Sequence, residues 1–148
     1  MGSDLVQCIF FLQHASSQLK IWHWQTRRHG HHKALDFLVD RLRELIDRLA
    51  ETTSGYLMNR QMRASAREGD ASRVRIALKN PLSMTYVNLD PDSDKGAITQ
   101  TQTYLSDLVE MVDGVNRNAC SESESSISSI LDDIVAVLQQ GIYLSDLR

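Results

Sequence analysis

The stretch HWQTRRHGHHKALDFLVDRLRELIDRLAE, from His23 to Glu51, decides the fold predicted for this chain. Leucines recur in its second half at alternating steps of three and four residues, the spacing that places side chains on one buried face of an α-helix. They are Leu35, Leu38, Leu42, Leu45 and Leu49. Gly30 precedes them and predicts a break, because glycine accepts the positive φ angle at which many helices end. The stretch therefore predicts the end of one helix, a turn at Gly30 and a long amphipathic helix.

A second, polar set of side chains runs along the edge of the leucine face. With residues about 100° apart around a helix, its members fall within an arc of roughly 100°. They are His32, Asp36, Asp40, Asp47 and Glu51. Another histidine, His23, lies at the end of the preceding helix. Imidazole and carboxylate groups together suit iron, manganese or zinc. The pattern therefore predicts a metal site at the junction of the two helices.

Length and composition are those of a soluble globular protein with a single domain, residues 1–148. The chain has 148 residues, of which 42% are hydrophobic and 24% are charged, and this is enough to bury a core. No apolar run approaches the roughly 18 residues that cross a membrane, and the N-terminus lacks the basic segment of a signal peptide. We therefore expect no membrane association.

Net charge and cysteine content bear on partners and location. A net charge of -3 gives no general attraction to nucleic acid, so we expect no nucleic-acid partner. The two cysteines, Cys8 and Cys120, are too few for a disulfide framework. We therefore expect a reducing, cytoplasmic location.

The first two helices are predicted on either side of Gly30. The first covers residues 3–27, with Ser3 or Asp4 as its cap, and the second continues to about residue 60. Apolar or small residues recur in the first at alternating steps of four and three, and the last member is a histidine. They are Leu5, Ile9, Leu12, Ser16, Leu19 and His23. This spacing predicts that His23 is buried.

Two more helices are predicted in the second half of the chain. The third covers residues 97–118. Ser121 and Glu124 have the spacing of a capping box, which opens a fourth helix that continues to about residue 148. Between the second and third helices, at about residues 62–95, both prolines and the run DPDSDKG predict a loop-rich connection. Within it, the apolar pieces VRIAL and MTYVNL are expected to pack as a brief helix or as an extended strip.

The lengths of these connections predict the topology. Short turns make the first and second helices, and the third and fourth, antiparallel neighbours. The long connection lets the chain return along the bundle, so that the second and third helices run parallel, which is the ferritin-like arrangement. The fold class predicted is therefore all-α: a four-helix bundle with a long crossover between helices 2 and 3. A disordered insert in an up-and-down bundle would have the same connection lengths.

The segment of residues 20–52 resembles the Dps branch of the ferritin superfamily, the mini-ferritins that oxidise and store iron. The resemblance rests on His23-Trp24, on His32-x-x-x-Asp36 and on Asp47-x-x-x-Glu51, in this order. It implies that His23 and His32 bind iron (Fe2+ or Fe3+) from one subunit. Asp47 and Glu51 would come from a twofold-related subunit, with Asp36 near the site. Fe(II) would then be oxidised by O2 or peroxide, which is a ferroxidase reaction.

The chain departs from the Dps pattern in three ways. The segment between His23 and His32 is shorter than is usual in the family. No lysine-rich tail is present, so the resemblance does not extend to DNA binding. The second half diverges, so it implies no closed cage. The wording HHKAL…ELIDRLAET, with IYLSDL near the end, also resembles small ferritin-like proteins of phages and large DNA viruses.

Helix geometry requires two copies of the chain for a shared site. Asp36 and Asp47 are separated by about 16 Å of helix rise, which one metal ion cannot bridge within a straight helix. Phe37 lies nearly opposite the leucine face, where a monomer has no obvious use for it. We therefore expect a homo-oligomer, at least a twofold dimer through the first two helices.

Two alternatives stay open at this point. The polar set could be a solvated helix face, with Arg43 forming surface ion pairs with Asp47 or Glu51. In that case the protein would be a non-catalytic helical oligomer, a viral accessory or structural protein that keeps the fold without the activity. His29 and His31 flank Gly30 and are expected to be solvated, although either could substitute as a metal ligand. Trp24 is expected to pack over the site.

Overall fold

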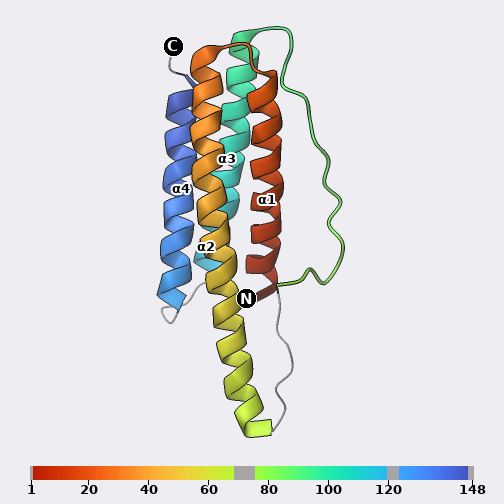
Figure 1. Cartoon of the computed structure of the whole chain (residues 1–148), viewed down its shortest axis with the longest axis vertical. Helices are drawn as coiled ribbons and strands as arrows, with labels where there is room; N and C mark the ends of the chain where they lie inside the picture. Colours follow the sequence, from red (N-terminus) through yellow and green to blue (C-terminus); the bar gives the residue numbers. More distant parts are fainter. Residues whose placement is uncertain (1, 69–75, 120–123, 147–148) are drawn as a thin grey trace.

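The computed structural model describes residues 2–68, 76–119 and 124–146, and within these ranges the chain forms four packed helices and no strand (Figure 1). The helices are α1 (Gly2–Gln25), α2 (His29–Glu68), α3 (Asp94–Ala119) and α4 (Ser125–Ser145). The prediction of an all-α four-helix bundle is therefore confirmed for the described residues.

Each helix packs mainly against two neighbours. Helices α1 and α4 both pack against α2 and α3, so α2 and α3 lie diagonally across the bundle. His31 in the first turn of α2 bonds to Thr101 near the start of α3, whereas Tyr56, far along α2, bonds to Glu124 beyond the end of α3. Helices α2 and α3 therefore run in the same direction, and Figure 1 shows α1 and α4 running the opposite way.

An extended strip, residues 84–90, lies along α1 and leads to α3 (Figure 1). The Gln18 amide donates to the carbonyl of Val87 at 2.9 Å and accepts from its N–H at 2.7 Å. The Trp22 indole N–H donates to the same carbonyl at 2.8 Å. One turn on, Gln25 accepts from the N–H of Leu89 at 2.8 Å. Side chains of α1 thus satisfy the backbone of this strip, which explains why it needs no partner strand.

The break between α1 and α2 lies at residues 26–28, and the predicted stop at Gly30 is wrong. Gly30 is in the first turn of α2. The Thr26 hydroxyl accepts from the N–H of Arg28 at 3.4 Å and bonds to the His31 ring at 2.9 Å. Short hydroxyl side chains compete with the helix for backbone donors in this way. Threonine chemistry, and not glycine, therefore ends α1.

Two other helix boundaries differ from the predictions. Helix α2 continues to Glu68 and projects past the ends of the other helices (Figure 1), where Met58 and Met62 are 52% and 64% exposed. Helix α4 begins at Ser125 with Glu124 as its N-cap residue, and the Glu124 side chain makes no capping bond. The capping box placed Glu124 inside the helix, so that prediction is wrong for Glu124, while Ser121 lies outside the described residues.

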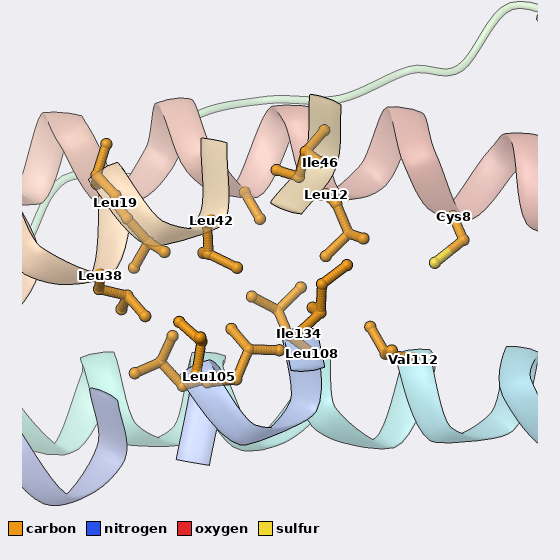
Figure 2. Packing of buried hydrophobic residues seen from close by; sticks show 14 of the residues in the cluster. Cys8, Leu12, Leu19, Leu38, Leu42, Ile46, Leu105, Leu108, Val112 and Ile134 are labelled. Carbon is orange, nitrogen blue, oxygen red and sulfur yellow. The ribbon is translucent and has the colours of Figure 1, made fainter. Parts of the chain in front are cut away.

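Apolar side chains from all four helices meet along the bundle axis (Figure 2). Four of the five predicted leucines of α2 are fully buried, and Leu45 is only half-buried because Ile46 takes its place in the core. Gly141 of α4 lets the helices approach, since an added Cβ would lie 2.9 Å from Leu38 and 3.3 Å from Leu105. The core residues labelled in Figure 2 include Leu12, Leu38, Leu42, Leu105 and Ile134.

Helix α4 is long and apolar enough to cross a membrane by length and composition alone. Its apolar face nevertheless lies in the bundle core, where Ile127, Leu131, Ile134 and Leu138 are buried. A core helix of a soluble bundle passes the same test, because it too is rich in apolar residues. The burial of this face accounts for the composition of α4.

Candidate metal centre at the junction of α1 and α2

Two of the predicted ligands, His23 and His32, lie against each other at the junction of α1 and α2. Their rings stack with centroids 3.8 Å apart and planes 27° apart. The pairing is reciprocal, since Nδ1 of His23 is 3.1 Å from the carbonyl oxygen of His32, and Nδ1 of His32 is 3.0 Å from that of His23. His23 is buried, as its position in the α1 seam predicted, and His32 is exposed.

These hydrogen bonds assign the protons on both rings. A carbonyl oxygen can only accept, so Nδ1 of each ring must carry the proton. In the neutral form, Nε2 of each ring then carries the lone pair that binds a metal. An Nδ1–H bonded to a backbone carbonyl is the usual way in which a metal-binding histidine is oriented. The junction therefore presents two histidines in the tautomer that suits metal binding through Nε2.

A third predicted ligand, Asp36, lies beside this pair. Its Oδ1 atom is 3.8 Å from Nε2 of His23 and 4.0 Å from Nζ of Lys20. Lys20 was not singled out from the sequence, although it precedes His23 by three residues and so shares a side of α1 with it. The side chain of Asp36 is half exposed. An exposed ion pair of this length is weak, so Asp36 is free to exchange Lys20 for another cation.

The other two predicted ligands, Asp47 and Glu51, are not brought to the histidines. Both are exposed on α2, about 16 Å or more of helix rise beyond Asp36. Neither forms an ion pair with any residue that the structure describes, and Arg43 does not close the gap between them. Within the described part of the chain, no three His, Cys, Asp or Glu side chains are grouped to hold a metal ion.

His31 is the residue at this junction that the sequence interpretation placed wrongly. It was expected to be solvated, but it is fully buried. Its Nδ1 is 2.9 Å from the Thr26 hydroxyl and its Nε2 is 3.0 Å from the Thr101 hydroxyl. Burial lowers the pKa of His31 below its ordinary value of 6.5, nearby Arg28 lowers it further, and Asp94 opposes the shift. The sequence does contain a signal for this burial, because His31 precedes Leu35 by four residues and so continues the leucine seam.

The remaining aromatic and histidine residues lie outside this pair. Trp24, expected to pack over the site, is 70% exposed within one chain, and His29 is exposed as expected. His14 bonds to the carbonyl of Thr85 at 2.9 Å and stacks on Tyr86. Phe37 is half-buried, with the Arg41 guanidinium 5.7 Å from its ring centre.

A cleft of about 680 Å³ lies close to the junction but is separate from the histidine pair. It lies between residues 25–27, the end of the extended strip and the start of α3, and none of the predicted ligands lines it. The Asp90 carboxylate in this cleft accepts the N–H of Asp92 at 2.9 Å and lies where a Cβ on Gly96 would be. This carboxylate is thus used in the turn that begins α3.

No protein-family model, curated protein or solved structure matches this chain.

Proposed function

We propose that this chain is an iron-binding protein of the ferritin-like, Dps type, which binds Fe(II) at a site shared by two copies and oxidises it with O2 or peroxide. The observation that carries the proposal is the His23–His32 pair. Both Nδ1 groups are bonded to backbone carbonyls, so both Nε2 atoms are left to bind a metal.

The positions of the carboxylates support a twofold site. In a dimer with antiparallel α2 helices, a twofold axis brings residue pairs with a common midpoint together. His32 with Glu51, and Asp36 with Asp47, share one midpoint, between Arg41 and Leu42. A single axis would therefore bring both pairs together at once. It would also cover the exposed side of α1 that carries Trp24.

The direction of the helices supports the same proposal. Parallel α2 and α3, joined by a connection that returns along α1, are what a ferritin-like crossover requires. In such proteins inward or interfacial His and carboxylate groups hold iron on rigid helices. Iron is here the substrate: each Fe(II) ion would give one electron to O2 or peroxide and leave as Fe(III). Storage of ferric iron would further require a closed assembly of many copies.

In this proposal the chain's own residues have separate tasks. His23 and His32 of one copy provide neutral nitrogen ligands, and Asp47 and Glu51 of the other provide negative charge for a cation. Asp36 would exchange its contact with Lys20 for one near the metal. Manganese or zinc would suit the same ligands, so the identity of the metal is part of what the experiment must establish.

A non-catalytic helical oligomer is the second candidate function. The observation that favours it is the absence of any group of three potential metal ligands within the described part of one chain. In that case the histidine pair would stabilise the helix junction only. Metal analysis of the purified protein distinguishes the two candidate functions, because a non-catalytic oligomer is not expected to contain about one iron ion per chain.

Mixing two defective variants tests the shared site directly. His32→Ala and Glu51→Ala should each abolish Fe(II) binding. When the two are unfolded together and refolded, about half of the dimers are mixed, and each mixed dimer contains one intact site and one doubly defective site. We expect about a quarter of the wild-type Fe(II) binding to return. His29→Ala mixed with Glu44→Ala is the matched control and should bind fully throughout. No recovery in the mixture would contradict a site shared between two copies.

A further inference from the structure

The buried His31 ring joins three segments of the chain at the end of the bundle. Its Nδ1 bonds to Thr26 in the connection after α1, and its Nε2 bonds to Thr101 in α3. His31 and Thr101 are both fully buried. The chain thus places a three-residue polar network, Thr26–His31–Thr101, between α1, α2 and α3, and such a network is stable only when every member is satisfied.

The proton on His31 can be assigned from this network. The Thr101 hydroxyl donates to the carbonyl of Ala97 at 3.0 Å, so toward His31 it acts as an acceptor. Nε2 of His31 therefore carries the proton, and Nδ1 accepts from the Thr26 hydroxyl. His31 is thus in the opposite tautomer to its neighbour His32 and to His23. Both of its nitrogens are occupied, so His31 is not available as a metal ligand.

His31 is coupled to the histidine pair through the backbone. The carbonyl that accepts Nδ1–H of His23 belongs to His32, the next residue after His31. Thr26 follows His23 by three residues, on the turn that ends α1, where its N–H bonds to the carbonyl of Trp22 at 2.9 Å. A movement of the His31 ring would therefore shift both backbone segments that orient the pair.

We propose that His31 is a positioning residue, which with Thr26 and Thr101 holds the His23–His32 pair in the arrangement that leaves both Nε2 atoms free. Its effect on metal affinity rests on the proposed function, whereas its effect on the two rings does not. Groups that orient metal-binding histidines change metal affinity by about 10- to 100-fold when they are replaced. The same range is expected for loss of the His31 network.

Thr101→Val removes the hydroxyl that accepts from His31 and keeps the size of the side chain. Proton–nitrogen correlation spectra of the histidine rings, recorded on the metal-free protein, report which nitrogen carries each proton. Wild type should show Nδ1–H tautomers for His23 and His32 and the Nε2–H tautomer for His31. In Thr101→Val we expect the ring signals of His23 and His32 to shift or broaden, and Fe(II) to bind about 10-fold more weakly or worse. Thr101→Ser should restore both.

Thr103→Val, an exposed position on the same helix, is the matched control and should change neither readout. A folded Thr101→Val protein with unchanged His23 and His32 signals would overturn the proposal, whatever its affinity for Fe(II). If the signals move although wild type binds no Fe(II), the positioning role stands and the proposed iron function fails. His31→Leu repeats the test from the other side of the bond, with a second loss of the same signals expected.

Discussion

The two ends of the polar face of α2 differ in how far the structure organises them. At the α1 end, His32 is oriented by a hydrogen bond to His23, and Asp36 faces Lys20 and His23. Toward the middle of α2, Asp47 and Glu51 are exposed and form no ion pair with any described residue. The first end is oriented by a neighbouring helix of the same chain, and the second has no such neighbour.

This difference shows which side chains a single bundle can hold in a fixed orientation and which it cannot. A ligand is held in place only where another element contacts it, and α1 reaches α2 at the junction where the chain turns. Farther along, the polar face of α2 points away from the bundle, so only a second molecule could contact it. The fold of one chain thus orients the side chains at the first end and leaves those at the second end without a neighbour.

The largest expected effect is the loss of iron binding when either end is removed. In the proposed site, His32→Ala takes away an oriented ligand and Glu51→Ala takes away a charged one, so each should abolish Fe(II) binding by anaerobic titration. Both positions are exposed in the single chain, so helical content by circular dichroism should stay unchanged. His29→Ala and Glu44→Ala, also exposed on α2, are the paired controls. Unchanged Fe(II) affinity in both site variants would show that the metal binds elsewhere or that the chain binds none.

A second test asks whether another copy of the chain covers the carboxylate end of α2. If the carboxylate end is completed by another copy, exposed Trp24 lies in the interface, and Trp24→Arg should weaken the dimer. Interface tryptophans often contribute about 2 kcal/mol or more, which is roughly a 30-fold change in Kd. Sedimentation equilibrium measures this change. Tyr143→Arg, which replaces an equally exposed aromatic on α4, should leave the dimer intact. A wild type that is monomeric at micromolar concentration would contradict the shared site.

The histidine end of the bundle should also show a pH-dependent stability that comes from His31. Burial, with a further contribution from Arg28, lowers the pKa of folded His31 below 6.5. The unfolded chain therefore binds a proton at higher pH than the folded chain does. The free energy of unfolding should fall as the pH decreases from 6.5 towards the folded pKa, and no further below it. Urea unfolding at several pH values measures the fall. His31→Gln should remove this part, whereas His29→Gln should keep it.

The smallest expected effect comes from replacing a glycine of α2 just beyond Glu51, which should make the helix stiffer there. Gly55 lies in the helix, and an added Cβ would meet nothing within 4 Å. Gly55→Ala should therefore raise the free energy of unfolding by about 0.5–1 kcal/mol. Gly114→Ala on α3, with equally open space, should give a similar gain. Gly141→Ala should instead destabilise the protein by about 1–3 kcal/mol, because its Cβ would press on Leu38 and Leu105. Equal gains at all three positions would contradict the packing described around α4.

The histidines show how far local pattern carries and where it fails. The seam spacing of α1 predicted the burial of His23, because burial on a helix follows from period alone. The same rule would have predicted the burial of His31. It was not applied there because Gly30 was interpreted as a helix end, which separated His31 from the leucine seam. The glycine was ambiguous because a glycine is tolerated in the first turn of a helix as well as at its end.

The sequence by itself determined the four helices, the leucine seam and the polar face of α2, since these depend on residue spacing along one helix. Tertiary structure alone decided the tautomers of the His23–His32 pair and of His31. Each of these depends on a partner far away or out of register: Thr101 lies 70 residues from His31, and the His23–His32 bonds need α1 and α2 to be packed. Hydrogen-bond partners are chosen in three dimensions, and no periodicity in one helix encodes them.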